Sequence, residues 1–145
     1  MKRLQGKTAI ITGGAKGMGE ATVRLFVEHG ARVVIGDILD EAGEALAGEL
    51  GDGVEFVHLD VSNEDDWAAA VKAAEALGPL NVLVNNAAIM RMIALSDTSV
   101  EDFMQIVRVN QLGTFLGMRS VTAPMKAAGG GSIINVSSID GLHSQ

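Results

Sequence analysis

The sequence contains no cysteine and no tyrosine, only two prolines and a single tryptophan. Without cysteine the chain can form neither a disulfide nor a thiolate metal site, and this absence is typical of proteins in a reducing cytoplasm. His29, His58 and His143 lack the spacing of metal ligands, so we expect no metal site. No segment approaches the roughly 18 consecutive apolar residues that indicate a membrane-spanning helix.

Basic residues are also scarce. Eleven lysines and arginines stand against 18 aspartates and glutamates, which gives a net charge of −7. Such a charge repels phosphate backbones and argues against a nucleic-acid partner. The basic N-terminus, Met1–Gly6, leads into a short strand pattern and lacks the apolar stretch of a signal peptide. We therefore expect a cytoplasmic protein that acts on a small molecule.

Short apolar runs alternate with longer helical patterns along the chain. This alternation is typical of βαβ units and a mostly parallel sheet. The runs are rich in valine and isoleucine and continuously apolar, as in strands that are buried on both faces. The length fits one domain, residues 1–145, of the α/β class with a Rossmann-type doubly wound sheet. The expected strands are Thr8–Thr12, Arg32–Ile35, Val54–His58, Asn81–Val84 and Ser132–Val136.

Helices are expected between these strands. In the first, Met18, Ala21, Leu25 and Phe26 fall on one face, and Gly30 follows as a stop signal. Asp40 can cap a second helix, which ends near Gly51. Ser62 and Asp65 form the expected capping box of a third helix, which turns Trp67, Val71 and Ala74 inward. A fourth helix is expected near Val100–Val107, and a fifth from about Asn110 to Ala127. On the fifth, Gly113 and Gly117 permit close packing.

A glycine-rich turn, Thr12-Gly13-Gly14-Ala15-Lys16-Gly17-Met18-Gly19, directly follows the first expected strand. Between a strand and a helix, such a turn lets the backbone approach a pyrophosphate that sits on the helix N-terminus. Glycines alone are equally compatible with a structural turn. The strand before them, the helix after them and an acid downstream favour nucleotide binding.

That acid is Asp37, at the end of the second strand. Its carboxylate can accept hydrogen bonds from the adenosine ribose hydroxyls and would repel a 2′-phosphate, which favours NAD over NADP. Lys16 leaves the alternative open, because a cation beside the turn attracts a 2′-phosphate. We expect Asp37 to dominate, since a carboxylate in direct reach of the 2′ position is the harder obstacle.

The spacing Thr-Gly-x-x-x-Gly-x-Gly, from Thr12 to Gly19, resembles the glycine motif of the short-chain dehydrogenase/reductase family. Four further segments match that family in the right order, and the resemblance spans all 145 residues. They are Asp60-Val61, similar to the pair that holds the adenine ring; Asn85-Asn86-Ala87-Ala88, similar to Asn-Asn-Ala-Gly except at Ala88; Asn110, at the position of the family's catalytic asparagine; and Asn135-Val136-Ser137-Ser138, similar to the segment with the catalytic serine. The amino-acid sequences of Gly36–Glu41 and Ile139–Leu142 are similar to those of bacterial hydroxysteroid dehydrogenases.

The resemblance implies an NAD-dependent oxidoreductase that interconverts a secondary alcohol and a ketone by hydride transfer. The substrate is expected to be apolar, of the steroid or alicyclic kind, and the assembly a homo-oligomer, a dimer or a homotetramer. The resemblance further implies the strand order 3-2-1-4-5 without the C-terminal strands, so that the fifth strand is an edge. It assigns catalytic roles to Ser138 and Asn110. The implied cofactor-binding residues are Thr12, Gly13, Lys16, Gly17, Met18, Gly19, Asp37, Ile38, Asp60, Val61, Asn86, Ala87 and Ala88.

Taken without the resemblance, two of these residues have simpler interpretations. Asn110 alone indicates a helix cap, and Ser137-Ser138 alone indicates a turn or capping pair. Met90, Met92, Ile93 and Leu95 form an apolar stretch that suits either core packing or a bulky apolar substrate.

The family's acid/base, a Tyr-x-x-x-Lys pair, is expected beyond Gln145. In that pair the positive lysine favours the tyrosinate. We therefore expect the chain to be the N-terminal part of a longer single-domain subunit and to be inactive by itself. The alternative is a non-catalytic NAD-binding fragment. A Rossmann-like methyltransferase also has an acid after its second strand. In that chemistry Asn85–Ala88 and Ser137-Ser138 would have no function, so we do not favour it.

Overall fold

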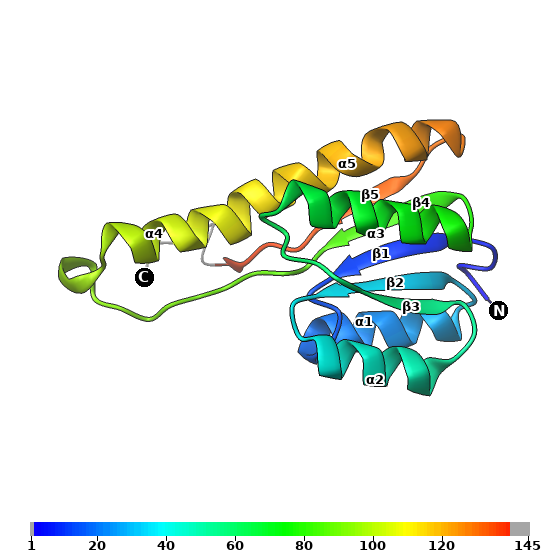
Figure 1. The fold of residues 1–145 in the computed structure, drawn as a ribbon, viewed down its shortest axis with the longest axis horizontal. Coiled ribbons are helices and arrows are strands. Elements are labelled where there is room, and N and C mark those ends of the chain that lie inside the picture. The colour runs from blue at the N-terminus through cyan, green and yellow to red at the C-terminus, as the bar shows by residue number, and fades with distance from the viewer. Residues whose placement is uncertain (1, 140–145) are drawn as a thin grey trace.

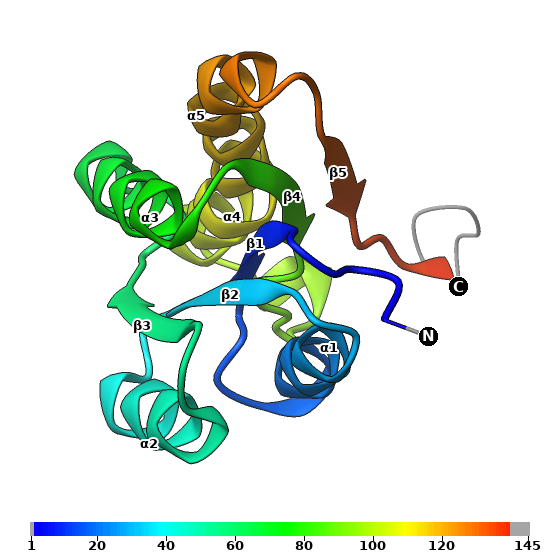
Figure 2. The same ribbon diagram turned by 90° about the vertical axis from the view of Figure 1, so that its right-hand side faces the viewer.

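The computed structural model describes residues 2–139, in which five parallel strands form one sheet with helices on both faces (Figures 1 and 2). The strand order is β3-β2-β1-β4-β5, which confirms the Rossmann-type sheet and the order 3-2-1-4-5. Residues 140–142, part of the likeness to hydroxysteroid dehydrogenases, lie outside the described residues. The strands are β1 (Thr8–Thr12), β2 (Arg32–Asp37), β3 (Val54–His58), β4 (Leu80–Asn85) and β5 (Ser132–Asn135).

Two helices cover each face of the sheet. Figure 2 shows α1 and α2 on one side, and α3 and α5 on the other. In Figure 1, α4 extends beyond the sheet. The elements are α1 (Gly17–Glu28), α2 (Asp40–Leu50), α3 (Glu64–Leu77), a 3-10 turn (Leu95–Asp97), α4 (Val100–Ile106), a π-helical segment (Val107–Leu112) and α5 (Gly113–Ala127).

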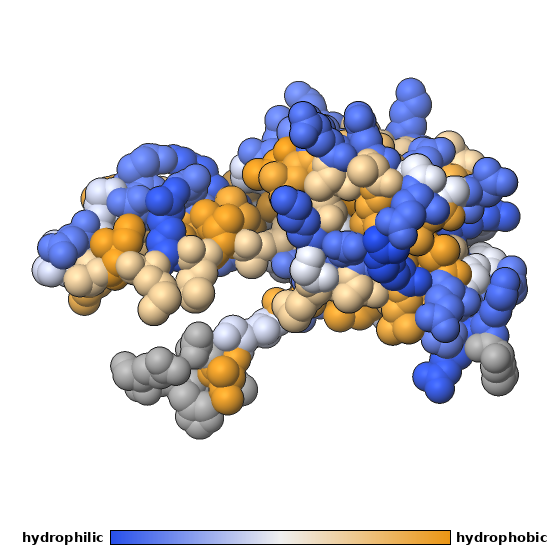
Figure 3. All heavy atoms as spheres, turned by 90° about the horizontal axis from the view of Figure 1, so that it is seen from below, coloured by the Kyte–Doolittle hydropathy of each residue, from blue (hydrophilic) through white to orange (hydrophobic). Residues whose placement is uncertain are grey.

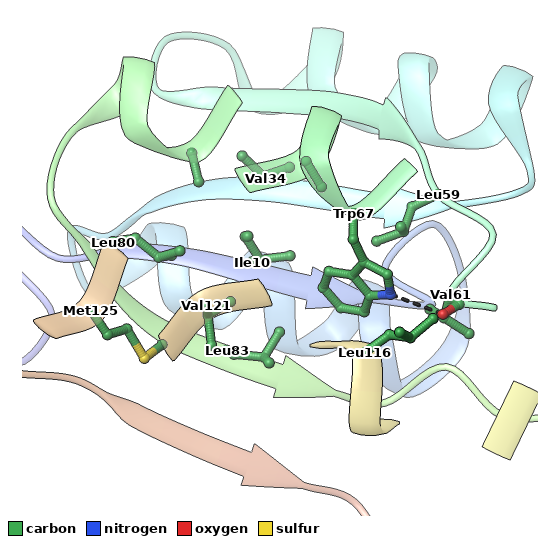
Figure 4. Packing of buried hydrophobic residues seen from close by; sticks show 12 residues of the cluster. Ile10, Val34, Leu59, Val61, Trp67, Leu80, Leu83, Leu116, Val121 and Met125 are labelled. Atoms are coloured by element: carbon green, nitrogen blue, oxygen red, sulfur yellow. Dashed lines mark hydrogen bonds between the residues drawn. The ribbon is translucent and has the colours of Figure 1, made fainter. Parts of the chain in front are cut away.

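The core has two halves, one on each face of the sheet, because successive strand residues point to opposite sides. In β1, Ile10 packs with Trp67 of α3 and Leu116 of α5, as Figure 4 shows. Its neighbours Ala9 and Ile11 belong to the second cluster, under α1 and α2. Burial on both faces explains why the strands are continuously apolar.

The apolar face of α1 is not its most buried side, although Phe26 of that face packs against the core. Met18 is 70% exposed and Leu25 is 50% exposed, whereas Gly19 and Val23 are buried. The reason is the close approach of the helix to the glycine turn: only Gly19 fits there, and Val23, one turn later, follows it inward. Counting apolar residues could not reveal this contact.

The expected caps of the second and third helices are also wrong. Asn63, not Ser62, caps α3, and its Oδ1 accepts a hydrogen bond from the Asp65 N–H at 2.9 Å. The Ser62 hydroxyl instead donates to Asp60 Oδ1 at 2.7 Å, where it orders the loop before the helix. Asp40 is already the first residue of α2, because Leu39 occupies the N-cap position.

The helices expected near Val100–Val107 and Asn110–Ala127 form one continuous helical element, joined by the π-helical segment. Asn110 is therefore not a cap. Its side chain bonds the backbone of a neighbouring loop, at Ile89, and the helix continues past it. Short π-helical segments inside helices are frequent at functional sites. The two glycines of α5 allow the expected close packing: a Cβ at Gly117 would lie 2.7 Å from the Trp67 ring.

The last strand and the helix α4 are the least covered parts of the fold. All four residues of β5 are exposed, and within residues 2–139 the strand pairs with β4 alone. In Figure 1 the α4 end projects beyond the sheet, and Figure 3 shows apolar residues exposed on this arm beside hydrophilic ones. Leu95, Val100 and Phe103 are exposed there. None of the helices in the described part of the chain is long and apolar enough to cross a membrane.

Candidate cofactor site

The glycine turn between β1 and α1 is built around close backbone contacts. Gly13 and Gly17 have positive φ angles of 62° and 59°, a conformation that side chains other than glycine disfavour. A Cβ at Gly19 would lie 1.9 Å from the carbonyl oxygen of Gly13. Glycine at these positions lets the turn form without backbone strain at Gly13 and Gly17 and without a clash at Gly19.

The N-terminus of α1 opens toward this turn. Lys16 occupies the N-cap position with an extended backbone, and within the described residues no cap hydrogen bond from its side chain closes the helix end. The first N–H groups of a helix lack intrahelical partners and attract anions. Gly17, Met18 and Gly19 carry these groups, so they can serve a phosphate through the backbone although the Met18 side chain points into solvent.

Thr12 and Asn86 join the ends of β1 and β4. The backbone N–H groups of Asn86 and Ala87 both donate to the Thr12 hydroxyl at 3.0 Å, and this hydroxyl donates to the Val84 carbonyl at 3.3 Å. The Asn86 amide donates to the carbonyl oxygens of Thr12 and Gly13, at 2.9 and 3.2 Å. Thr12 is buried, so the structure gives it a positioning task at this edge.

Asp37, at the end of β2, also holds the glycine turn. Its Oδ2 accepts a hydrogen bond from the Ala15 N–H at 2.9 Å, and its Oδ1 accepts one from the Leu39 N–H at 3.1 Å. The residue is only 9% exposed. Each carboxylate oxygen has two lone pairs, so one on each oxygen remains for a ligand. The sequence predicts a ligand role for Asp37 but does not indicate this structural one.

Asp60 and Val61 are held in place by consecutive residues of α3. Asp66 Oδ2 accepts a hydrogen bond from the Asp60 N–H at 2.9 Å. The indole N–H of the fully buried Trp67 donates to the Val61 carbonyl at 2.8 Å, the dashed line in Figure 4. The first turn of α3 thus fixes the backbone of both residues.

These elements surround a cavity of about 370 Å³ at the carboxyl edge of the sheet, where ligands of doubly wound sheets bind. Among the candidate residues, those that line it are Gly13, Asp37, Ile38, Asp60, Val61, Asn86, Ala87 and Ala88. Sequence reasoning missed four lining residues: Leu59, Ile89, Gln105 and Val109. Leu59 and Ile89 adjoin the motifs and could have been inferred, whereas the contribution of the helix through Gln105 and Val109 depends on tertiary packing.

Lys16 lies apart from this cavity, in a neighbouring hollow that it lines with Ile38, Leu39, Asp40, Glu41 and Ala42. Two carboxylates therefore accompany the one lysine. Asp40 also pairs with His58 Nδ1 at 2.6 Å, and this hydrogen bond raises the pKa of His58 above its ordinary value. The hollow is poorly suited to a 2′-phosphate, because its acids repel one.

Asn110 and Ser138, the expected catalytic pair, occupy different surroundings. The Ile89 N–H donates to Asn110 Oδ1 at 2.9 Å, and the Asn110 Nδ2 donates to the Ile89 carbonyl at 2.8 Å. Asn110 thus fixes a loop that lines the cavity. Ser138 is exposed, three residues past β5. The end of β5 is tied to β4 because the Val136 N–H donates to the Asn85 carbonyl, and the Asn85 amide donates to Asn135 Oδ1.

Comparison with known proteins places this geometry in a family. The model of the short chain dehydrogenase family matches residues 7–145. The chain is 53% identical over 141 residues to a 3-alpha-(or 20-beta)-hydroxysteroid dehydrogenase of Mycobacterium tuberculosis, covering 97% of this chain and 54% of that protein. It is 44% identical over 150 residues to a trans-4-hydroxycyclohexanecarboxylate dehydrogenase of Sinomonas cyclohexanicum, covering 97% and 58%.

A solved structure agrees with these relatives. The crystal structure of a 3-ketoacyl-(acyl-carrier-protein) reductase from Brucella melitensis complexed with NADH superposes with a TM-score of 0.89 at 39% identity. The match covers 94% of this chain and 59% of that one. The chain spans about half the length of the curated relatives it matches. The matched family model, the sheet order and the glycine turn agree, and the chain belongs to the short-chain dehydrogenase family.

Proposed function

We propose that the chain forms the NAD-binding part of an oxidoreductase that interconverts a secondary alcohol and a ketone. The observation that carries this proposal is the cavity at the carboxyl edge of the sheet, which Asp37 and Asp60 line together with Gly13 of the turn that leads into α1. A helix N-terminus suits a pyrophosphate, and a carboxylate after the second strand suits ribose hydroxyls. The relative from Brucella melitensis was crystallised with NADH.

The residues present fit a dinucleotide. Gly13 lies so close to Ala87 that an added Cβ would be 3.0 Å from the Ala87 Cα. Because glycine has no side chain, the turn can pack against the loop after β4 and leave the N-terminus of α1 accessible. We assign the pyrophosphate to the backbone of Gly13–Gly19 and the adenosine ribose to Asp37 and Ile38. The adenine ring is assigned to Asp60 and Val61, and the remainder of the cofactor to Asn86, Ala87 and Ala88. Thr12 keeps the strand ends in register.

Two residues are assigned to the reacting end. Bound NAD supplies the hydride acceptor, and the protein orients the groups around it. The Ser138 hydroxyl would hydrogen bond to the substrate oxygen and stabilise charge there. Each end of the Asn110 side-chain amide makes one bond to Ile89, so its second N–H and the second lone pair of Oδ1 are what it could offer to a water of a proton relay.

The substrate, assembly and location belong to the same proposal. The names of the relatives describe enzymes of hydroxysteroids and of a hydroxycyclohexane carboxylate, and we extend the steroid or alicyclic class to this protein. The exposed apolar Met90, Met92 and Leu95 suit such a substrate. We further propose a single domain that extends past residue 145, a homo-oligomer of two or four subunits, and a cytoplasmic location.

Titration of the chain with NAD and with NADP tests the cofactor assignment. NAD should bind more tightly. Because Asp37 also accepts a hydrogen bond from Ala15, the test uses the isosteric variant Asp37→Asn. It removes the negative charge and keeps one acceptor oxygen. We expect the ratio of the Kd for NADP to the Kd for NAD to fall by roughly tenfold or more, because one charge-assisted hydrogen bond is lost. Asp52→Ser, an exposed acid in the turn before β3, is the control for lost charge. Equal binding of both cofactors before mutation would contradict the assignment and favour Lys16.

Turnover distinguishes the enzyme from its alternative, a non-catalytic NAD-binding chain. The two differ in the acid/base tyrosine that the family resemblance implies, which residues 1–145 do not include. In the natural polypeptide that carries the sequence, Ser138→Ala should lower turnover about a hundredfold, with little change in NAD affinity. Ser137→Ala is the matched control and should be mild. If NAD binds but no secondary alcohol on a panel of hydroxysteroids and cyclohexanols is oxidised, the alternative holds.

A further inference from the structure

The turn between α2 and β3, Gly51-Asp52-Gly53, is both exposed and rich in glycine. Gly51 and Gly53 have positive φ angles of 74° and 86°, and glycine gives the backbone more conformational freedom than any other residue. Asp52 between them is exposed. In Figure 1 the turn lies at the amino ends of the strands, at the end of the sheet opposite to the carboxyl edge with the cavity. The turn has no task in the function proposed above.

The carboxyl group of Asp52 has no partner that would hold it away from the backbone. Within residues 2–139 no hydrogen bond or ion pair binds this side chain, whereas Asp65, which also lacks one, lies in α3, where helical dihedral angles fix the backbone that follows it. The other aspartates in the described part of the chain each accept a hydrogen bond through the carboxylate; they are Asp37, Asp40, Asp60, Asp66, Asp97 and Asp102.

The residue that follows Asp52 is glycine, so no side chain shields the next backbone nitrogen. The neighbours of this nitrogen are bonded: the Val54 N–H donates to the Gly51 carbonyl at 3.2 Å, and the Val33 N–H donates to the Gly53 carbonyl at 2.9 Å. In the part of the chain that the structure describes, the Gly53 N–H itself makes no hydrogen bond. The Gly53 nitrogen and the Asp52 carboxyl carbon are therefore free to approach each other.

We propose that Asp52 and Gly53 form a site of spontaneous covalent modification, at which the aspartate isomerises to isoaspartate through a cyclic imide. The Gly53 nitrogen loses its proton and forms a bond to Asp52 Cγ, while one Cγ–O bond breaks and its oxygen leaves as water. Water then opens the imide. Opening at Cγ restores the aspartate, and opening at the Asp52 backbone carbonyl leaves the chain running through Cβ and Cγ. One water is released and one is consumed, so the reaction needs neither oxidant nor reductant.

Isomerisation would insert one methylene group into the backbone of the turn. The insertion lies between the Gly51 carbonyl and the Val54 N–H, which are hydrogen bonded at present. Val54 is also the first residue of β3 and pairs with Val33 of β2. Within residues 2–139, β3 is an edge strand that pairs with β2 alone. We therefore expect the modified chain to unfold at a lower urea concentration than the unmodified chain.

The test incubates the natural polypeptide that carries the sequence, folded and at neutral pH, and follows isoaspartate by peptide mapping. A protein isoaspartyl methyltransferase with labelled S-adenosylmethionine marks the carboxylate that isomerisation releases. The peptide that contains Asp52 should gain label with time. Asp52→Glu keeps the charge but requires a less favourable six-membered imide, so it should lose this label. Asp52→Asn should gain it faster, because a neutral amide carbon is attacked more readily than an ionised carboxylate. Circular dichroism checks that both variants fold.

The peptide that contains Asp97 is the internal control, because Asp97 is exposed but is followed by Thr98. It should stay unlabelled. Peptide mapping also separates Asp52 from the second Asp-Gly pair, Asp140-Gly141, which lies outside the described residues. If the Asp52 peptide gains label in urea but not in the folded polypeptide, the fold protects the turn and the inference is wrong. Equal labelling of the Asp52 and Asp97 peptides would overturn it as well. None of these outcomes depends on the proposed NAD function, because neither cofactor nor turnover enters the measurement.

Discussion

Two strands of the same sheet, β1 and β5, have similar apolar sequences and opposite environments. All five residues of β1 are buried, and all four residues of β5 are exposed. β1 lies between β2 and β4 and under helices on both faces, whereas β5 pairs with β4 alone in the part of the chain that the structure describes. The difference shows that an apolar run predicts a strand, while the number of neighbours decides how much of it is buried.

The polar groups at the ends of the two strands follow the same contrast. The turn after β1 is fixed by hydrogen bonds to Thr12, Asp37 and Asn86. The segment after β5 is tied through Asn85 and Asn135 to β4, and Asn135 itself is exposed. The turn after β1 is thus bonded to β2 and to the end of β4, whereas the bonds of Val136 and Asn135 run to β4.

The contrast between the two strands predicts very different costs for one type of mutation. Ile10→Ala in β1 should destabilise the chain by about 2–5 kcal/mol, because it leaves a cavity against Trp67 and Leu116. Ile134→Ala in β5 should cost below about 1 kcal/mol, since the side chain is exposed. Urea unfolding followed by tryptophan fluorescence measures both. Similar losses for the two variants would break the comparison.

A smaller loss of stability is expected from a mutation in the glycine turn after β1, because backbone contacts rather than buried apolar side chains support this turn. Gly19→Ala places a Cβ 1.9 Å from the Gly13 carbonyl, so the turn must shift; we expect roughly 1–3 kcal/mol of destabilisation and a loss of NAD binding. Gly48→Ala, in α2 with nothing within 4 Å of the added Cβ, is the control. It should stabilise by about 0.5–1 kcal/mol. Unchanged NAD affinity in Gly19→Ala would show that the turn is adaptable.

Trp67→Phe tests how much one buried hydrogen bond contributes to the core that covers β1. Phenylalanine keeps an aromatic ring in the core but removes the N–H that donates to the Val61 carbonyl. We expect a loss of about 1–3 kcal/mol, because a buried acceptor is left unsatisfied and some ring volume is lost. Circular dichroism must follow unfolding here, since the fluorophore is gone. NAD titration should show weaker binding if Val61 contacts the adenine; an unchanged Kd would mean that Val61 is held by other contacts.

The smallest effect concerns the other edge strand, β3, where His58 pairs with Asp40. The hydrogen bond to Asp40 raises the pKa of His58 in the folded chain. The stabilisation is therefore fully present below the ordinary pKa of histidine and is lost as the pH rises through the raised folded value. Both side chains are more than half exposed, so we expect at most about 0.5 kcal/mol. The comparison of urea midpoints at pH 5.5 and 8.5 measures this difference, which Asp40→Asn should remove; an unchanged difference in Asp40→Asn would assign it to other groups.

The sequence by itself determined the class of fold and the motifs of the proposed cofactor site. β1 and β3 have the bounds that their apolar runs predict, and β2, β4 and β5 differ by one or two residues at their ends. This succeeds because strands buried on both faces are continuously apolar and because the glycine turn and the acids each lie at or just after the end of a strand in the chain. The family resemblance supplied the strand order, and the sheet confirms it.

Only the tertiary structure decided which face of α1 is buried, which residue caps α3, and that the helix runs on through Asn110. Each depends on a contact that apolar periodicity does not encode: Gly19 lies against Gly13, Ser62 bonds to Asp60 in place of capping the helix, and Asn110 bonds to Ile89 in another element. The same holds for Gln105, whose place in the cavity wall follows from how the helix lies across the loop after β4. Local patterns encode periodicity and turn chemistry, but the partner of a side chain is fixed only when the elements pack together.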